Sequence, residues 1–141
     1  MMAEVMFTSK ATAEGGREGH VKSANGVVDH NLVMPKGGSP TTEGTNPEEL
    51  FAAGYAACFD GALNLIASKA EKEIDSKITA EVSLIKDPSD DGFKLGVLLN
   101  AHVNGVSQEE AEDLVHKAHD FCPYSKATRN NIEVELNVVT G

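Results

Sequence analysis

Tryptophan is absent from this sequence, and aromatic residues make up only 5% of its 141 residues. Helices and sheets must therefore pack mainly through Ala, Val, Leu and Ile, which gives a modest core for one chain. The apolar fraction of 40% is ordinary for a soluble globular protein. The length predicts a single domain over residues 1–141, and the modest core favours association into a homodimer.

Basic residues are also scarce, and no run of them occurs in the sequence. The 12 Lys and Arg residues face 22 Asp and Glu residues, so the formal net charge is -10. Binding to phosphate groups depends on clustered Lys and Arg. The composition therefore argues against nucleic acid and against anionic membrane surfaces as partners.

The sequence lacks the pattern of a signal peptide or a membrane span. Glu4 stands near the N-terminus, where a signal peptide has a basic start, and no long apolar stretch follows it. The most apolar helical stretch, residues 50–59, is about half the length that a span needs, and Asp60 follows it. We therefore expect a core helix, no membrane association and a cytoplasmic location.

The first half of the chain predicts short strands followed by a long helix. Gly15-Gly16 and Asn25-Gly26 separate β-rich pieces between residues 5 and 34, which predicts an antiparallel meander. Residues 36–45 are rich in Gly, Ser, Pro and Thr and predict a loop. Thr45 and Asn46 offer a side-chain cap ahead of Pro47, and apolar periodicity predicts a helix over residues 47–74.

The second half predicts a hairpin, a helix and a closing strand. Apolar residues alternate over residues 78–84, a second β-rich run covers residues 93–103, and the turn between them falls at residues 87–92. Ser107 opens a capping box, and Pro123 is expected to stop the helix that follows. Alternation resumes over residues 132–138. The order of strands, helix, strands, helix and strand predicts an α+β fold.

The two cysteines are the candidate reactive groups. Cys58 lies among small apolar residues in the middle of the long helix, where simple burial of the thiol is an equally good interpretation. Cys122 lies at a helix end, where we expect the thiol to be reachable. In a reducing compartment metal binding, redox chemistry and burial all remain open. The positions suit a peroxidatic and resolving pair without requiring one.

The sequence gives weaker signals for a zinc site, for a functional role of Arg17 and for nucleotide binding. His116, His119 and Cys122 could supply three zinc ligands, but the fourth is unspecified and Pro123 bends the chain at the third. Arg17 lies in a glycine-rich turn, where a solvated surface charge is the simplest interpretation. The sequence contains no nucleotide-binding glycine fingerprint, no Walker loop and no C-x-x-C pair.

Two segments resemble the signature segments of the organic hydroperoxide resistance proteins of the Ohr/OsmC family. They are TNPEELFAAGYAACF, residues 45–59, and HDFCPYSKATRNNIEV, residues 119–134. The upstream pieces GGREG and NGVVD also resemble this pattern, so the likeness covers nearly the whole chain. The intact NPE and CPYSKAT pieces favour this group over the related OsmC proteins, whose peroxidases are the nearest alternative.

The resemblance implies an Ohr/OsmC-like fold, in which antiparallel sheets pack around a long central helix and two chains intertwine as a homodimer. It implies a thiol peroxidase that reduces alkyl and lipid hydroperoxides to alcohols and protects against oxidative stress. No bound cofactor or metal is implied. The reductant would be a dithiol, namely the dihydrolipoyl group of lipoylated proteins. A non-enzymatic thiol redox sensor remains the alternative from another class.

The resemblance also assigns roles to four residues. Cys58 matches the peroxidatic cysteine, Cys122 the resolving cysteine, Arg17 the active-site arginine and Glu48 its carboxylate partner. A guanidinium group lowers the pKa of a nearby thiol, and a carboxylate can hold that guanidinium through two hydrogen bonds. One straight helix would nevertheless separate the Cα atoms of Glu48 and Cys58 by about 15 Å. Either Glu48 lies on a non-helical segment, or two subunits build the site together, and we favour the subunit interface.

Overall fold

The computed structural model describes residues 3–141. The chain divides into two compact units, Met1–Leu50 and Phe51–Gly141. Each unit has its own sheet, and the long helix begins at the end of the first unit and continues through the second. The single domain over residues 1–141 stays a prediction.

The first unit contains a small antiparallel sheet. Its strands are β1 (Ala11–Glu14), β2 (His20–Ser23) and β3 (Asp29–Asn31), paired in the order β1-β2-β3. A short 3-10 helix, η1 (Gly16–Glu18), joins β1 to β2. Gly15 and Gly16 take the left-handed backbone conformation in this turn, with φ of 80° and 66°. The predicted meander is confirmed, although its first apolar residues, 5–7, lie outside the strands.

The long helix, α1 (Pro47–Lys69), begins where the sequence predicted. The Oδ1 atom of Asn46 accepts a hydrogen bond from the backbone N–H of Glu49 at 2.7 Å, which caps the first turn. The helix ends at Lys69 rather than at residue 74. Glu71 takes a left-handed conformation (φ 57°), and the backbone N–H of Lys72 donates to the carbonyl of Ala67, which closes the helix.

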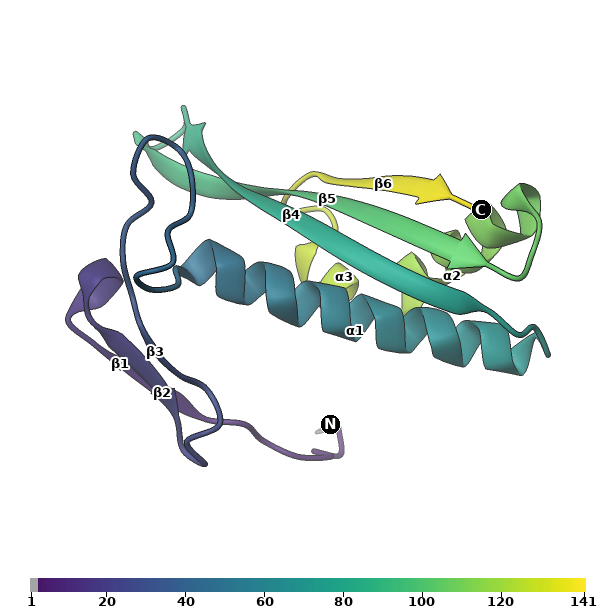
Figure 1. Ribbon diagram of the computed structural model, residues 1–141, viewed down its shortest axis with the longest axis horizontal. Helices are drawn as coiled ribbons and strands as arrows, with labels where there is room; N and C mark the ends of the chain where they lie inside the picture. Colours follow the sequence, from purple (N-terminus) through teal and green to yellow (C-terminus); the bar gives the residue numbers. More distant parts are fainter. Residues whose placement is uncertain (1–2) are drawn as a thin grey trace. The chain divides into compact units, whose positions relative to one another are not determined.

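The second unit contains a mixed sheet (Figure 1). Strands β4 (Asp75–Asp87) and β5 (Gly92–Asn104) form the predicted antiparallel hairpin. Strand β6 (Val134–Val139) pairs with β5 in parallel, so the expectation of only antiparallel pairing is wrong for this edge. The reason is topological. The chain between β5 and β6 forms a helical crossover, which returns it to the end of the sheet where β5 started.

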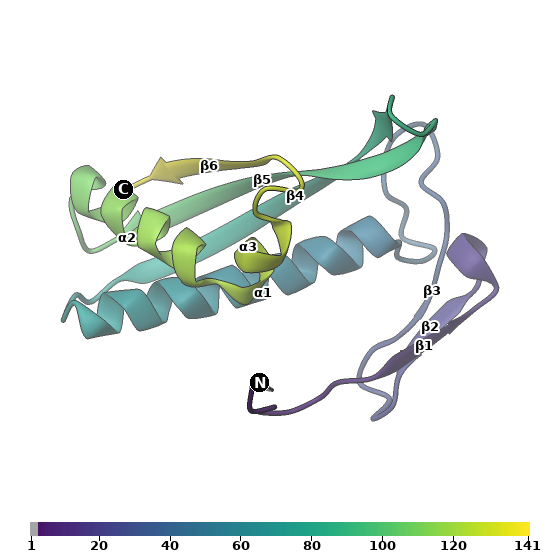
Figure 2. The same ribbon diagram turned by 180° about the vertical axis from the view of Figure 1, so that it is seen from behind.

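Two helices make this crossover (Figure 2): α2 (Gln108–Phe121) and α3 (Pro123–Thr128). The predicted capping box at Ser107 is confirmed, because its Oγ atom accepts from the backbone N–H of Glu110 at 3.1 Å. Pro123 ends α2 as predicted, but it also begins α3, which was not predicted. Cys122 has an extended backbone and links the two helices.

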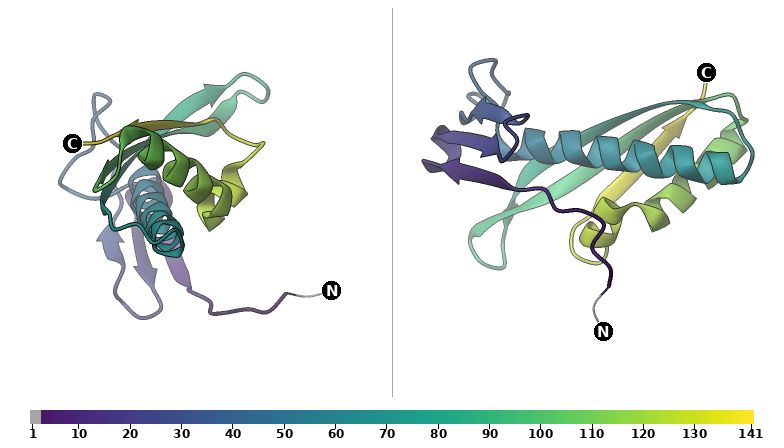
Figure 3. Two further views of the ribbon diagram at one scale, coloured as in Figure 1. Left: turned by 90° about the vertical axis from the view of Figure 1, so that its right-hand side faces the viewer. Right: turned by 90° about the horizontal axis from the view of Figure 1, so that it is seen from below.

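The core of the second unit lies between the sheet and its helices, because α1 and α2 pack on the same side of the sheet (Figure 3). Tyr55, Phe59 and Leu63 of α1 are fully buried there. Among residues 3–141, α1 is the one helix long and apolar enough to cross a membrane, judged by length and composition alone. Its buried residues pack in the core of the second unit, although only 28% of its most apolar stretch is buried within this chain.

Candidate redox site

The second unit brings the two cysteines together. Cys58 lies in the middle of α1, and Cys122 lies at the junction of α2 and α3. The thiol of Cys122 donates to the Sγ atom of Cys58, and the two sulfur atoms are 3.6 Å apart. A disulfide requires about 2.05 Å between sulfur atoms. The reduced thiols are therefore already in contact, and their oxidation to a disulfide would require only a small movement of the sulfur atoms.

The two thiols differ in exposure, and the expectation that the Cys122 thiol would be reachable is wrong. Cys122 is fully buried, whereas Cys58 is partly exposed. The extended link between α2 and α3 places Cys122 in the core cluster, where Ala118 packs as well. A reagent from solvent therefore meets Cys58 before Cys122.

The environment of Cys58 acts on its pKa in both directions. Burial raises the pKa of the Cys58 thiol above its usual range, the backbone N–H of Tyr124 lowers it, and the adjacent Cys122 thiol raises it again. Burial is the largest of these effects. Within this chain the surroundings therefore favour the thiol over the reactive thiolate.

Three aromatic rings lie beside Cys58. The centroids of Phe51, Tyr55 and Tyr124 are 5.6–6.0 Å from one another. Gly54 makes room for this cluster, because a Cβ atom at this position would lie 2.5 Å from the hydroxyl oxygen of Tyr124. Tyr55 is fully buried, whereas Phe51 and Tyr124 are partly exposed.

The first unit holds the other two candidate residues together. Arg17 follows the glycine turn at the start of η1, and its Nη1 and Nη2 atoms donate to the two carboxylate oxygens of Glu48 at 2.8 and 3.0 Å. This two-bond pairing holds the guanidinium group in a fixed orientation. It also lowers the pKa of Glu48, so the carboxylate stays charged. Arg17 is thus an ion-paired residue and not a freely solvated charge.

Glu48 lies in the first turn of α1. The alternative that placed Glu48 on a non-helical segment is therefore wrong, because Pro47 and the Asn46 cap start the helix before it. Along this helix the Cα atoms of Glu48 and Cys58 are separated by about 15 Å, at ~1.5 Å per residue.

The residues considered as zinc ligands do not gather around one point. Within residues 3–141 no group of three His, Cys, Asp or Glu side chains is arranged to hold a metal ion. The Nδ1 atom of His119 instead makes a hydrogen bond to Ser125. A cavity of about 830 Å³ lies near the C-terminal end of α1 and contains neither cysteine.

Sequence reasoning gave no role to Tyr124, whose backbone N–H bonds to the Cys58 thiol, or to Ser125, three positions after Cys122, because it missed α3. A signal for this helix was present. Proline is common at the first position of a helix, so Pro123 could have been interpreted as a start as well as a stop.

Comparison with known proteins identifies the family. Residues 38–137 match the family described as OsmC-like protein. The organic hydroperoxide resistance protein OhrB of Bacillus subtilis is 54% identical over 133 residues, which are 94% of this chain and 98% of that protein. OhrA of the same organism is 50% identical over 97% of this chain and 99% of its own length.

Solved structures give the same result. The crystal structure of OhrB of Bacillus subtilis has a TM-score of 0.90 at 53% identity, covering 96% of this chain and 100% of that one. An organic hydroperoxide resistance protein from Elizabethkingia anophelis has a TM-score of 0.91 at 49% identity, covering 99% and 100% of the two chains. The Ohr/OsmC-like fold is therefore confirmed, and this chain belongs to the organic hydroperoxide resistance proteins of the OsmC-like family.

Proposed function

We propose that this protein confers resistance to organic hydroperoxides as a thiol peroxidase that reduces them to alcohols. The observation that carries the proposal is the 3.6 Å contact between a partly exposed and a buried thiol, Cys58 and Cys122. The names of the relatives support the same substrate class. The partly exposed rings of Phe51 and Tyr124, which pack against the same core as Cys58, favour organic hydroperoxides over hydrogen peroxide.

The proposed cycle uses only thiol chemistry. The Cys58 thiolate attacks the terminal oxygen of the hydroperoxide, the O–O bond breaks, and the alkoxide leaves as the alcohol after taking a proton. Cys58 is then a sulfenic acid. Cys122 attacks its sulfur to form the disulfide and release water. An external dithiol exchanges with this disulfide and restores both thiols, so no bound metal or flavin is needed.

Arg17 is proposed to activate Cys58. Burial raises the pKa of Cys58 in this chain, so a peroxidatic role requires a positive group that favours the thiolate. The guanidinium of Arg17, held by Glu48, has the charge and the fixed orientation for this task. We propose that the Arg17–Glu48 pair of one protomer serves the Cys58 of its partner.

An intertwined homodimer would provide this arrangement. Ala53, Ala57 and Gly61 recur along α1 and are all exposed in the single chain. Only 28% of the most apolar stretch of α1 is buried. A helix face without bulky side chains lets another backbone approach closely, which supports a subunit interface along α1.

The proposed reductant is the dihydrolipoyl group of lipoylated proteins, and the proposed location is the cytoplasm. A reducing compartment would keep Cys58 and Cys122 as thiols between turnovers. A dithiol suits this task, because it can release itself as a cyclic disulfide after one exchange.

The test is steady-state peroxidase turnover with a bulky alkyl hydroperoxide and with hydrogen peroxide. Dihydrolipoamide and thioredoxin are compared as reductants, and Cys58→Ser is the inactive control. We expect turnover by the wild type with the alkyl hydroperoxide and dihydrolipoamide, and none by Cys58→Ser, because a hydroxyl group cannot replace the thiolate. Disulfide formation without turnover would instead support a redox sensor.

A further inference from the structure

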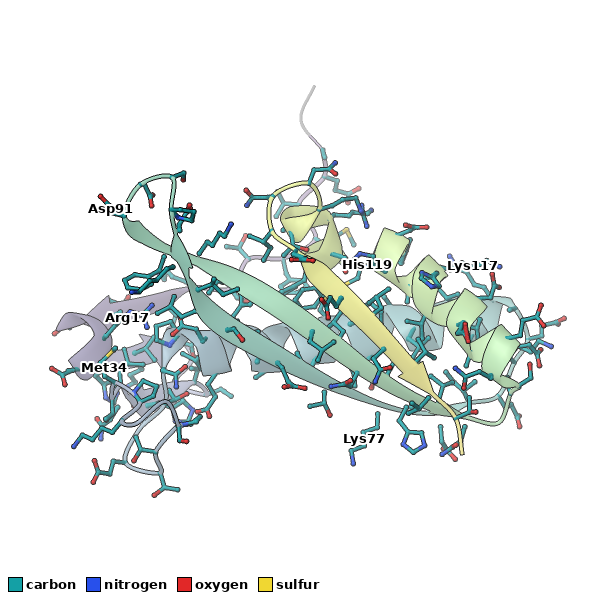
Figure 4. The ribbon with its side chains drawn as sticks, turned by 90° about the horizontal axis from the view of Figure 1, so that it is seen from above. Arg17, Met34, Lys77, Asp91, Lys117 and His119 are labelled. Carbon is teal, nitrogen blue, oxygen red and sulfur yellow. The ribbon has the colours of Figure 1, made fainter. Side chains whose placement is uncertain are left out.

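A buried cluster of polar side chains joins the elements that carry the two cysteines. The hydroxyl groups of Tyr55 and Ser125 are 2.7 Å apart, and the Nδ1 atom of His119 is 2.8 Å from the same Ser125 oxygen. Tyr55 and Ser125 are both fully buried. Figure 4 shows His119 near the C-terminal end of α2, next to α3. We call Tyr55, His119 and Ser125 the Ser125 hub.

Each member of the hub lies about one helical turn from a thiol. Tyr55 precedes Cys58 by three positions on α1, and His119 and Ser125 lie three positions before and after Cys122. The hub therefore connects α1 to both helices that meet at Cys122. It spans the same three elements as the contact between the sulfur atoms.

Ser125 is the member that hydrogen-bonds to both of the others. Its hydroxyl group has one hydrogen, so a consistent network has Tyr55 donating to Ser125 and Ser125 donating to Nδ1 of neutral His119. Thr128 adds a further link, because its Oγ1 atom donates to the backbone carbonyl of Ser125 at 3.2 Å. Removing the Ser125 hydroxyl would leave the part-buried imidazole without this partner, and the buried phenol with only the longer contact to Thr128 Oγ1 at 3.4 Å.

We propose that the Ser125 hub positions Cys122 against Cys58 for disulfide formation, and that Ser125 is a positioning residue of the resolving step. This inference rests on the proposed function. In that step the Cys122 sulfur attacks the sulfur of the Cys58 sulfenic acid, the S–S bond forms and the S–O bond breaks. The proton of Cys122 leaves with the hydroxide as water. The hub restricts the separation of the thiols before the step, so the reacting sulfur atoms need to move little.

The first measurement does not depend on peroxidase activity. The Cys58–Cys122 pair is equilibrated with reduced and oxidised glutathione, in which two glutathione thiols reduce one protein disulfide and form one oxidised glutathione. The equilibrium gives the effective concentration of one cysteine at the other. We expect Ser125→Ala to lower this effective concentration about tenfold, because two polar groups lose their partner and the junction at Cys122 relaxes.

A matched control lies at the other end of α2. Ser107→Ala removes the capping box and costs about 1 kcal/mol of stability, but it leaves the hub intact. We expect it to leave the effective concentration unchanged. Tyr55→Phe is the milder variant of the hub, because it removes one hydroxyl group and keeps the ring. It should lower the effective concentration less than Ser125→Ala, and it tests the proposal if Ser125→Ala does not fold.

The second measurement follows the reaction with an organic hydroperoxide. Relative to the formation of the sulfenic acid, Ser125→Ala should close the disulfide more slowly than the wild type does, so a larger share of Cys58 reaches sulfinic acid as hydroperoxide increases. An unchanged effective concentration in the hub variants would overturn the proposal. A wild type that consumes no hydroperoxide would overturn the proposed function, while a lowered effective concentration would still support the positioning role.

Discussion

The sulfur atoms of Cys58 and Cys122 are 3.6 Å apart, although 64 positions separate the residues in the sequence. The contact follows from the core of the second unit. Phe59 and Ala118, each near one of the cysteines in the sequence, are both fully buried in that core. The extended backbone of Cys122 then directs its side chain inward between α2 and α3.

The close approach of Gly54 to Tyr124 predicts a specific effect of alanine. A Cβ atom at position 54 would lie 2.5 Å from the Tyr124 hydroxyl oxygen, so Gly54→Ala must displace Tyr124. The backbone N–H of Tyr124 lowers the pKa of Cys58, so we expect this pKa to rise and the reaction with hydroperoxide to slow. Thiolate absorbance against pH measures the shift. In Gly54→Ala combined with Tyr124→Phe, the pKa of Cys58 should return most of the way to its wild-type value, because the nearest clashing atom, the Tyr124 hydroxyl oxygen, is absent.

If two chains associate along the exposed face of α1, the dimer should require a small residue at Gly61. A Cβ atom at this position meets nothing within 4 Å in the single chain, so a larger side chain fits the isolated fold. We expect Gly61→Leu to weaken the dimer while circular dichroism shows an unchanged helix content. Analytical ultracentrifugation measures the association. His116→Leu, which adds a similar side chain to an exposed position of α2, should leave it intact, and a fully dimeric Gly61→Leu would disprove an interface along this face.

The Arg17–Glu48 pair predicts that the pKa of Cys58 depends on the orientation of the guanidinium group as well as on its charge. Arg17→Ala removes the positive charge, and Arg17→Lys keeps it but lacks the two nitrogen atoms that make parallel hydrogen bonds to Glu48. We expect the pKa of Cys58 to rise in both variants, more in Arg17→Ala. The first oxidation should slow about tenfold for each unit by which the pKa rises, at pH values below the pKa. Stopped-flow rates as a function of pH test this. Profiles identical to wild type would leave Arg17 with a structural role alone.

The burial of His119 predicts a dependence of stability on pH. Burial, assisted by the charge of Arg129, lowers the pKa of His119 below its usual value of 6.5. The unfolded chain therefore binds this proton first as the pH falls. The contribution of neutral His119 is complete above about pH 6.5 and is lost as the pH falls from there toward the lowered pKa of the folded state.

The difference in unfolding free energy between the wild type and His119→Gln isolates this contribution. As the pH falls below about 6.5, the wild type should lose stability relative to His119→Gln. His20 has a raised pKa, so its contribution to stability changes with pH in the opposite direction. This contribution is the same in both proteins and cancels in the difference. A difference that is constant with pH would show that His119 titrates as in the unfolded chain.

Much of the fold could be predicted because its signals are local. The Asn46 cap with Pro47, the capping box of Ser107 and the turn between β4 and β5 each depend on neighbouring residues, and each is present. The end of α1 could not be predicted, because Glu71 adopts the left-handed conformation that glycine usually signals. The direction of β6 was also missed, since it depends on where the crossover returns the chain.

The candidate site could be predicted only in part. The resemblance pointed to the cysteines and to the Arg17–Glu48 pair, and the structure shows each pair in contact. The exposures of the thiols and the Ser125 hub depend on tertiary packing of α1 against α2 and α3. No periodicity in the sequence carries that information.

One equivalent of an organic hydroperoxide, added to the fully reduced wild type, tests the central claim most directly. Peptide mapping without reduction should show an intramolecular Cys58–Cys122 disulfide, and Cys122→Ser should consume about one equivalent and stop at the sulfenic or sulfinic acid of Cys58. If Cys122→Ser instead cycles like wild type with dihydrolipoamide and the wild type forms no such disulfide, Cys122 does not resolve Cys58 and the account is wrong.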